Sequence, residues 1–237
     1  MRIDHLGHSG FLVETDGALL LFDYYRGDLS CLDRAPDKPL FVFVSHAHGD
    51  HFNPAVFSLQ TRRTGVCYLL AFDLRGNTAV PGTAHVQYLE ADACCPVPGL
   101  GTVRTLRSTD EGVAFLVETG KETLFHAGDL NWWDWPGEDR NWLAGQERVF
   151  KQEIGRLSGV RIDVGFVVLD DRLEENFDRG MAWFLSVCSC RFVLPMHFWE
   201  DGGVIRRFLE KHGALCETTR ILDTANENHW EIKIQEE

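Results

Sequence analysis

The string Phe-Leu-Val-Glu-Thr occurs twice in this chain, at residues 11–15 and 115–119, and both copies stand in the same setting. Each is followed by a turn containing glycine, a second apolar run and then an aspartate, which is Asp23 or Asp129. Two apolar runs joined by a short glycine turn are typical of a β-hairpin. The chain is therefore predicted to contain two similar strand–turn–strand–Asp units.

Further apolar runs predict the elements around these hairpins. Buried strands are predicted at residues 40–44, 66–71, 86–89, 164–169, 192–196, 221–222 and 230–234. Helices are predicted at residues 54–63, 140–157, 180–188 and 204–212, and a loop within the domain at residues 96–99. Hairpins followed by alternating strands and helices favour an α/β (α+β) fold in which two sheets pack together with helices outside. We expect one domain, 1–237, with two halves of roughly 1–100 and 101–237.

Composition narrows the class of protein. The net charge of -13 would repel the phosphates of nucleic acid and of anionic membranes, so neither is expected as a partner. The chain shows no apolar run of the ~20 residues that a membrane span needs, and its start does not resemble a signal peptide. Seven cysteines without a C-x-x-C pair favour free thiols. We therefore expect a cytoplasmic location.

Residues 46–51 carry the strongest chemical signal. They read His-Ala-His-Gly-Asp-His and directly follow the predicted strand at 40–44. His46, His48 and His51 share this tight turn with Asp50. Imidazoles together with a carboxylate suit zinc and other borderline divalent metals. So many ionisable groups on one turn are costly without a metal, and the motif therefore predicts a metal site.

Two further residues stand where such a site needs ligands. Asp129 follows the second hairpin and Gly128, a residue that lets the backbone approach closely. His197 directly follows the predicted strand at 192–196. Side chains at the ends of separate strands converge on one sheet edge, so we expect both residues to join the histidine turn.

These motifs together resemble the metallo-β-lactamase-fold superfamily of metal-dependent hydrolases over nearly the full length of the chain. The opening Leu-Gly-His-Ser-Gly-Phe at residues 6–11 is similar to the start of the branch that includes L-ascorbate-6-phosphate lactonase-like proteins. The resemblance implies a four-layer αββα sandwich with one or two metals at the sheet edge. It also implies that His46 and His48 bind the first metal, that Asp50, His51 and His197 bind the second, and that Asp129 bridges them.

The sequence departs from the family pattern at one position. The family has a further histidine in the loop before the strand that contains Phe115, where this chain reads Arg-Ser-Thr-Asp-Glu-Gly at 107–112. Asp110 is the preferred substitute, because a carboxylate binds a metal far better than the hydroxyl of Ser108 or Thr109. A single-metal site built on Asp50, His51, Asp129 and His197 is the alternative.

The expected activity follows from these ligands. A divalent metal lowers the pKa of bound water from ~15.7 toward ~7. The resulting metal-bound hydroxide would attack an ester, lactone, amide or phosphoester of a small molecule. Asp50 and Asp129 are the predicted catalytic residues, Asp50 as a ligand and Asp129 as the group that orients the hydroxide. Zinc is the expected metal, with Mn²⁺ or Fe²⁺ as alternatives, because several divalent metals suit this donor set.

Four residues are candidates for the substrate pocket. His8 follows a glycine near the first hairpin, Trp132 and Trp133 follow Asp129, and Arg172 follows the strand at 164–169. Aromatic side chains beside a metal favour a pocket wall for an apolar or ring-bearing substrate, and Arg172 suits an anionic group. The alternatives are a structural histidine, aromatic residues that pack the loop, and a salt-bridged turn.

Two other functions remain open at this stage. One is a phosphodiesterase or nuclease of the same fold, which the acidic charge and the lack of a long basic stretch disfavour. The other is a catalytically idle metal-binding protein, which the absent family histidine favours. A di-iron oxygen-reducing enzyme would need a redox partner domain, for which 237 residues leave no room. The sequence names neither the substrate nor the oligomeric state.

Overall fold

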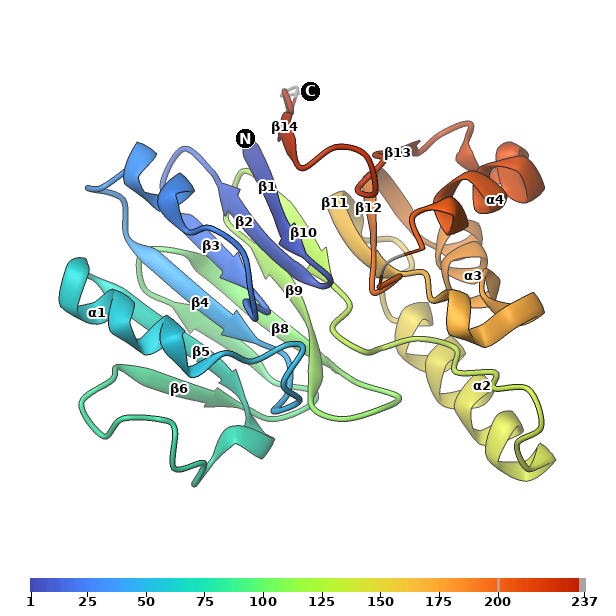
Figure 1. Cartoon of the computed structure of the whole chain (residues 1–237), viewed down its shortest axis with the longest axis horizontal. Helices are drawn as coiled ribbons and strands as arrows, with labels where there is room; N and C mark the ends of the chain where they lie inside the picture. Colours follow the sequence, from blue (N-terminus) through green and yellow to red (C-terminus); the bar gives the residue numbers. More distant parts are fainter. Residues whose placement is uncertain (200, 235–237) are drawn as a thin grey trace.

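The structure is a computed structural model that describes residues 1–199 and 201–234. Within these residues, two seven-stranded sheets pack face to face (Figure 1). The first sheet has the order β14 (His229–Glu231), β1 (Arg2–Gly7), β2 (Gly10–Glu14), β3 (Leu19–Phe22), β4 (Leu40–Val44), β5 (Val66–Ala71) and β6 (Val86–Leu89). The second has the order β13 (Arg220–Ile221), β12 (Ser189–Met196), β11 (Arg161–Val168), β10 (Thr123–His126), β9 (Val113–Glu118), β8 (Gly101–Arg107) and β7 (Cys94–Val97).

Both sheets are built on the same plan. In each, antiparallel pairs lead through a central hairpin into parallel strands: β2–β3 precede β4, β5 and β6, and β9–β10 precede β11, β12 and β13. The two central hairpins are those predicted from the repeated string. Because parallel strands end on the same edge of a sheet, the turns after β3, β4, β10, β11 and β12 gather at one edge.

Strand β4 shows how the layers arise. Phe41 and Phe43 belong to the core between the sheets, where the rings of Phe43 and Phe115 lie 5.2 Å apart. Leu40 and Val42 belong to a second core on the outer face, with Phe57 from the adjoining helical segment. A strand buried on both faces needs an unbroken apolar sequence, which explains the run at 40–44.

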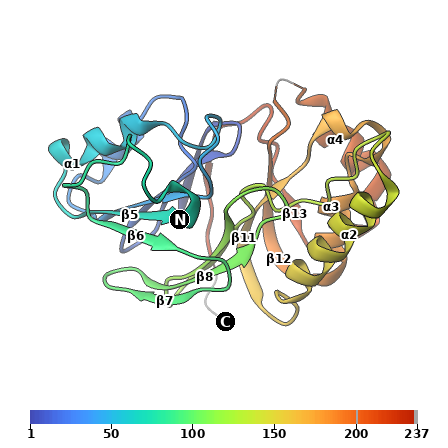
Figure 2. The same cartoon turned by 90° about the horizontal axis from the view of Figure 1, so that it is seen from below.

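Helices cover the outer faces of both sheets (Figures 1 and 2). The first sheet carries α1 (Leu59–Arg62), and the second carries α2 (Arg140–Gly155), α3 (Arg179–Val187) and α4 (Gly203–His212). The described residues also contain short 3₁₀ helices: η1 (Ser30–Arg34), η2 (Pro54–Ser58), η3 (Phe72–Leu74), η4 (Asp171–Asn176) and η5 (Gly213–Cys216). The predicted αββα sandwich is confirmed.

Several local predictions differ from the structure. The predicted strand at 230–234 is shorter, because β14 ends at Glu231. The predicted loop at 96–99 is wrong in part, because Pro96 and Val97 belong to β7. A proline is tolerated there because β7 is the edge strand of its sheet, where one side of the backbone has no strand partner. The predicted helix at 54–63 is divided into η2 and α1. Strands β1 and β8 were not predicted, since polar residues interrupt their apolar pattern.

Across residues 1–199 and 201–234, no helix has the length and apolar character required to cross a membrane.

Candidate metal centre

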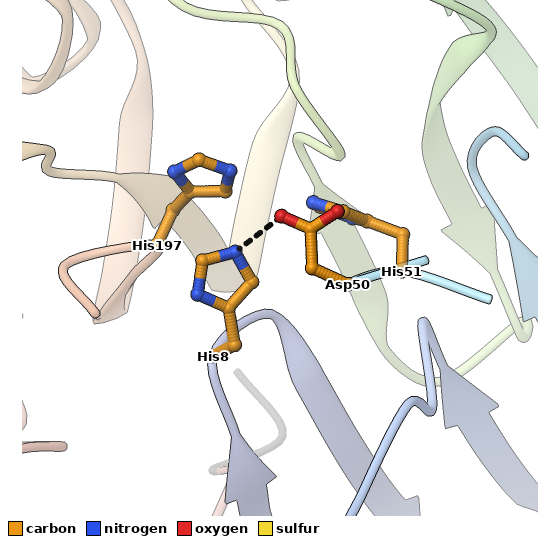
Figure 3. A group of neighbouring side chains, drawn as sticks. All are labelled: His8, Asp50, His51 and His197. Carbon is orange, nitrogen blue, oxygen red and sulfur yellow. Dashed lines mark ion pairs between the residues drawn. The ribbon is translucent and has the colours of Figure 1, made fainter. Parts of the chain in front are cut away.

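The turn after β4 brings its ionisable residues to the shared sheet edge, where a first group forms with residues from other elements. His8, Asp50, His51 and His197 each offer one ligand atom, and these atoms all lie within 4.8 Å of one another (Figure 3). Nε2 of His8 lies 3.3 Å from Oδ2 of Asp50. The three histidines are buried. We call these four residues the inner group.

A second group lies beside it. His46, His48, Asp110 and Asp129 also place one ligand atom each within 4.8 Å of one another, and we call them the outer group. Nδ1 of His48 is 3.7 Å from Oδ2 of Asp110, and these side chains are 46% and 45% exposed. The structure thus brings Asp110, the residue predicted to replace the family histidine, beside His48 in a position open to solvent.

Asp129 connects the two groups. Its Oδ1 lies 3.1 Å from Nε2 of His51 and 3.3 Å from Nε2 of His197, which both belong to the inner group. Its Oδ2 lies 3.5 Å from Nε2 of His46 in the outer group. One carboxylate with an oxygen toward each group has the arrangement that a bridging ligand requires.

The atoms that face the centre have no hydrogen-bond partner within the described residues. They are Oδ1 of Asp129 and Nε2 of His8, His46, His51 and His197. A buried polar atom left unpaired costs about 1–3 kcal/mol, so a set of them at one point needs a compensating group. Converging imidazole nitrogens and carboxylate oxygens are the donors that a divalent metal of the zinc type takes. The residues present therefore fit a metal ion.

The opposite nitrogens of the same rings are held by buried acceptors. Nδ1 of His51 donates to Asp23 at 2.8 Å, and Nδ1 of His197 donates to Asp170 at 2.9 Å. Ser45 Oγ lies 2.9 Å from Nδ1 of His46 and donates to Asp23 at 2.6 Å. Such partners hold each ring with Nε2 toward the centre, so that its lone pair is directed there when the ring is neutral.

Asp23 and Asp170 were not predicted as site residues. The signal was present in both cases, because Asp23 directly follows β3 and Asp170 lies two residues after the end of β11. Asp23 also occupies the position in the first hairpin unit that Asp129 occupies in the second. The strand-end position of each aspartate could therefore have identified both.

The carboxylates of the centre favour positive charge beside them, and burial opposes it. Burial lowers the pKa of His8 and that of His46 to about 4, so both rings are neutral near neutral pH. Burial acts in the same direction on His197, but Asp129 and Asp170 outweigh it and raise its pKa to about 9. Burial likewise opposes ionisation of Asp129, yet His197 and His51 hold the pKa of this carboxyl well below its usual range.

Local backbone geometry brings the two sheets together at the centre. His8 has φ +54° and His197 has φ +69°. These values lie in the left-handed region, which is strained for non-glycine residues, and such strained residues are common at active sites. A Cβ on Gly112 would lie 1.8 Å from the carbonyl oxygen of Ser45, and one on Gly128 would lie 2.7 Å from Cβ of Ser45. Only glycine therefore lets turns of the second sheet reach the segment that carries His46.

A cavity of about 250 Å³ opens beside the centre. Trp133 and Arg172, two of the candidate pocket residues, line it together with Trp135. The prediction for Trp132 is wrong: its ring lies under Nζ of Lys151 at 4.3 Å and lines a separate cavity beside α3. Trp132 and Trp133 are consecutive and point to different sides of the loop.

His8 lies at the site, as expected, but it does not line this cavity. It belongs to the inner group, because the β1–β2 turn places its ring against that of His197, with ring centres 4.2 Å apart.

The fold and the site define a metallo-β-lactamase-type sandwich with a centre suited to metal. A family model described as the beta-lactamase superfamily domain matches residues 2–132, which is more than half of the chain. The protein therefore belongs to the β-lactamase superfamily. The predicted membership in the metallo-β-lactamase-fold superfamily is confirmed, and the narrower lactonase-like branch stays a prediction.

Individual proteins agree with this assignment. The chain is 28% identical over 215 residues to a UPF0173 metal-dependent hydrolase of Desulforamulus reducens, with 84% of each chain covered. Its fold is similar to that of Igni18, a metallo hydrolase from Ignicoccus hospitalis (TM-score 0.68, 16% identity, 98% of this chain and 99% of that chain). It is also similar to CmlA, a diiron beta-hydroxylase from Streptomyces venezuelae (TM-score 0.59, 13% identity, 98% of this chain and 54% of that chain).

Proposed function

We propose that this protein is a metal-dependent hydrolase that cleaves an ester, lactone, amide or phosphoester of a small molecule. The observation that carries the proposal is the set of buried imidazole nitrogens that converge on the carboxylates of Asp129 and Asp50 without a hydrogen bond. The name of the relative from Desulforamulus reducens, a metal-dependent hydrolase, supports the same reaction class.

The inner and outer groups would hold the metal, with Asp129 between them. When bound, a divalent metal lowers the pKa of a coordinated water and polarises an oxygen of the substrate. Asp129 accepts a hydrogen bond from the attacking water and so orients its lone pair toward the scissile carbon or phosphorus. Asp50 serves as an anionic ligand whose carboxylate His8 holds in place. Asp23 and Asp170 keep two histidines in the tautomer that faces the centre.

Zinc is the metal we propose, with Mn²⁺ or Fe²⁺ as alternatives. Imidazole suits zinc and iron, whereas carboxylate also suits manganese, so the mixed donor set of the two groups supports each of them. A diiron centre is named for CmlA, which shares the fold alone. We further propose a cytoplasmic location, which the seven free cysteines support.

A small molecule is the substrate we propose, rather than nucleic acid or a membrane lipid. The cavity of about 250 Å³ lies below the ~300–1,000 Å³ typical of ligand pockets, and it contains one arginine beside several aspartates. The net charge of -13 would repel the polyanionic backbone of a nucleic acid.

The test combines metal content with hydrolysis. Protein purified without chelator is analysed for metal and assayed with dihydrocoumarin, 4-nitrophenyl acetate and bis(4-nitrophenyl) phosphate. We expect bound metal and hydrolysis of the lactone or ester, both lost in His51→Gln and both kept in His85→Gln, a control at an exposed histidine outside the two groups. Cleavage of the phosphodiester alone would instead support the phosphodiesterase alternative. Bound metal without any hydrolysis would support the idle metal-binding protein.

A further inference from the structure

Arg172 is the only lysine or arginine among the described residues that line the cavity beside the metal centre. Its Nε and Nη2 donate to the buried carboxylate of Asp170, at 3.0 Å for Nε. Its Nη1 has no hydrogen-bond partner among the described residues, and the side chain is 47% exposed. One edge of the guanidinium is thus fixed, and the other is free to bind an anion.

Two tryptophans hold the guanidinium between them. Its Cζ lies 5.4 Å from the ring centre of Trp135 and 5.3 Å from that of Trp199. Such cation–π contacts favour one orientation of the planar fork. Asp170 also accepts from Nδ1 of His197, so a single carboxylate sets the position of Arg172 relative to the inner group. The arginine is therefore positioned before any ligand arrives.

Two stacked tryptophans, which we call the aromatic wall, connect the metal centre with this arginine. Trp133 lies beside His197, with ring centres 5.7 Å apart, and stacks on Trp135 with an interplanar angle of 3°. Nε1 of Trp133 donates to the backbone carbonyl of Asp129, so its polar end is already paired. Trp133 is buried, so the half-buried Trp135 offers the apolar surface to a ring.

Gln146 of α2 adds a polar group to the same cavity. Its Oε1 is buried and makes no hydrogen bond within the described part of the chain. An unpaired amide oxygen is suited to accept from an N–H or O–H of a ligand. The cavity therefore combines one fixed cation, one free acceptor and one aromatic wall.

We propose that the substrate is a small ring-bearing carboxylic acid derivative. Its free carboxylate would bind Nη1 of Arg172, its ring would lie on Trp135, and its scissile group would lie at Asp129. The inference rests on the proposed hydrolase function and specifies its substrate class. One arginine matches one carboxylate, and a cavity of about 250 Å³ admits a single ring rather than a polymer.

Ligand binding to the metal-loaded protein tests this assignment. The probes are phenylacetate, acetate as the anion without a ring, and benzyl alcohol as the ring without a charge, each measured by tryptophan fluorescence and calorimetry. We expect phenylacetate to bind about tenfold or more tightly than either partial probe. Arg172→Gln should weaken phenylacetate by about tenfold and leave benzyl alcohol unchanged, because only the charged hydrogen bond is lost.

Arg179→Gln is the matched control. Arg179 is 46% exposed, lies over the ring of Trp132 at 5.7 Å and pairs with the buried Asp134, but it lines a different cavity. We expect Arg179→Gln to leave phenylacetate binding unchanged. Equal effects of the two arginine variants, or no effect of Arg172→Gln, would overturn the inference.

A second variant guards against indirect damage, since Asp170 contacts both Arg172 and His197. Trp135→Leu should remove the preference for phenylacetate over acetate, with metal content unchanged by elemental analysis. If this preference survives in Trp135→Leu, the aromatic wall is not the binding surface and the inference fails.

Hydrolysis assayed in parallel separates the two proposals. Absent hydrolysis with probe binding as expected would overturn the function alone, and hydrolysis with binding insensitive to Arg172 would overturn the substrate class alone.

Discussion

The inner and outer groups have the same size and similar donors, yet their surroundings differ. The three histidines of the inner group are buried, and Asp23 and Asp170 hold two of them from behind. In the outer group, His48 and Asp110 are half exposed. Nε2 of His48 also lies 3.5 Å from a carboxylate oxygen of Glu111, outside the group. Ligands that are fixed in advance lose less entropy on binding, so we expect the inner group to bind metal more tightly.

The source of each ligand explains this difference. The inner group takes residues from the β1–β2 turn, the β4 turn and the end of β12, so both rigid sheets define its geometry. The outer group depends on Asp110, which lies in the loop between β8 and β9. A site held by strand ends is more precise than a site completed by a loop.

The largest expected effect comes from the residue that the two groups share. Asp129→Ala should remove metal from both groups and abolish hydrolysis, because Asp129 contacts three histidines across them. Elemental analysis of the purified variant, with circular dichroism to verify folding, measures this. A folded Asp129→Ala protein with full metal content would show that the carboxylate does not bridge.

A comparison of the variants His8→Gln and His48→Gln tests the two groups directly. We expect His8→Gln to weaken the tighter metal by about a hundredfold and His48→Gln to leave that metal within about tenfold, since His8 is buried in the inner group and His48 is half exposed in the outer group. Titration with Co²⁺, followed by visible absorption, reports both affinities. Equal losses of affinity for the tighter metal in the two variants would contradict the expectation that the inner group binds metal more tightly.

Acid should destabilise the metal-free protein through His8 and His46. Both have a pKa of about 4 in the fold, below the ordinary 6.5, because burial disfavours their charged forms. The unfolded chain therefore binds protons that the folded chain does not, and stability falls as pH drops from 6.5 to 4. Each group accounts for about 3 kcal/mol at the acid end.

Urea unfolding of the chelated protein across this pH range measures that loss. His8→Gln should make the acid slope shallower, because one of the titrating groups is gone. An unchanged slope in His8→Gln would show that His8 is protonated in the folded state as readily as in the unfolded chain.

The smallest effect concerns the substituted position of the outer group. Asp110→Ala should lower metal content from two per chain to one, whereas Ser108→Ala should leave it unchanged, because Ser108 Oγ accepts from the backbone N–H of Asp110 and belongs to neither group. Elemental analysis beside the parent protein decides this. One metal in both parent and Asp110→Ala would indicate a single site at the inner group.

Sequence reasoning found the residues whose pattern is local. The turn at 46–51, Asp129 and His197 each follow a buried strand, and a strand end is visible in the sequence as the point where an apolar run stops. The hairpins were visible for the same reason. Strand β8 was missed because polar residues interrupt its few apolar ones. Which of its residues are buried becomes clear only from the strands that pair with it.

The roles that were missed or misplaced depend on contacts between distant segments. His8 joins the inner group only because β1 and β12 bring residues 8 and 197 together. Asp170 acts through His197, which lies 27 positions further along the chain. Trp132 and Trp133 could not be distinguished, since the direction of each side chain is decided by what packs around the loop.

The sequence by itself determined the two packed sheets with helices outside and the donors available for a metal, because apolar periodicity and a dense histidine turn are local properties of the chain. The four-layer αββα order was implied by the family resemblance. Only the tertiary structure decided how those donors divide into a buried and an exposed group and which carboxylates orient them. It also placed Arg172 at the end of an aromatic wall. Burial and direction are set by packing between residues far apart in sequence, and no local pattern specifies them.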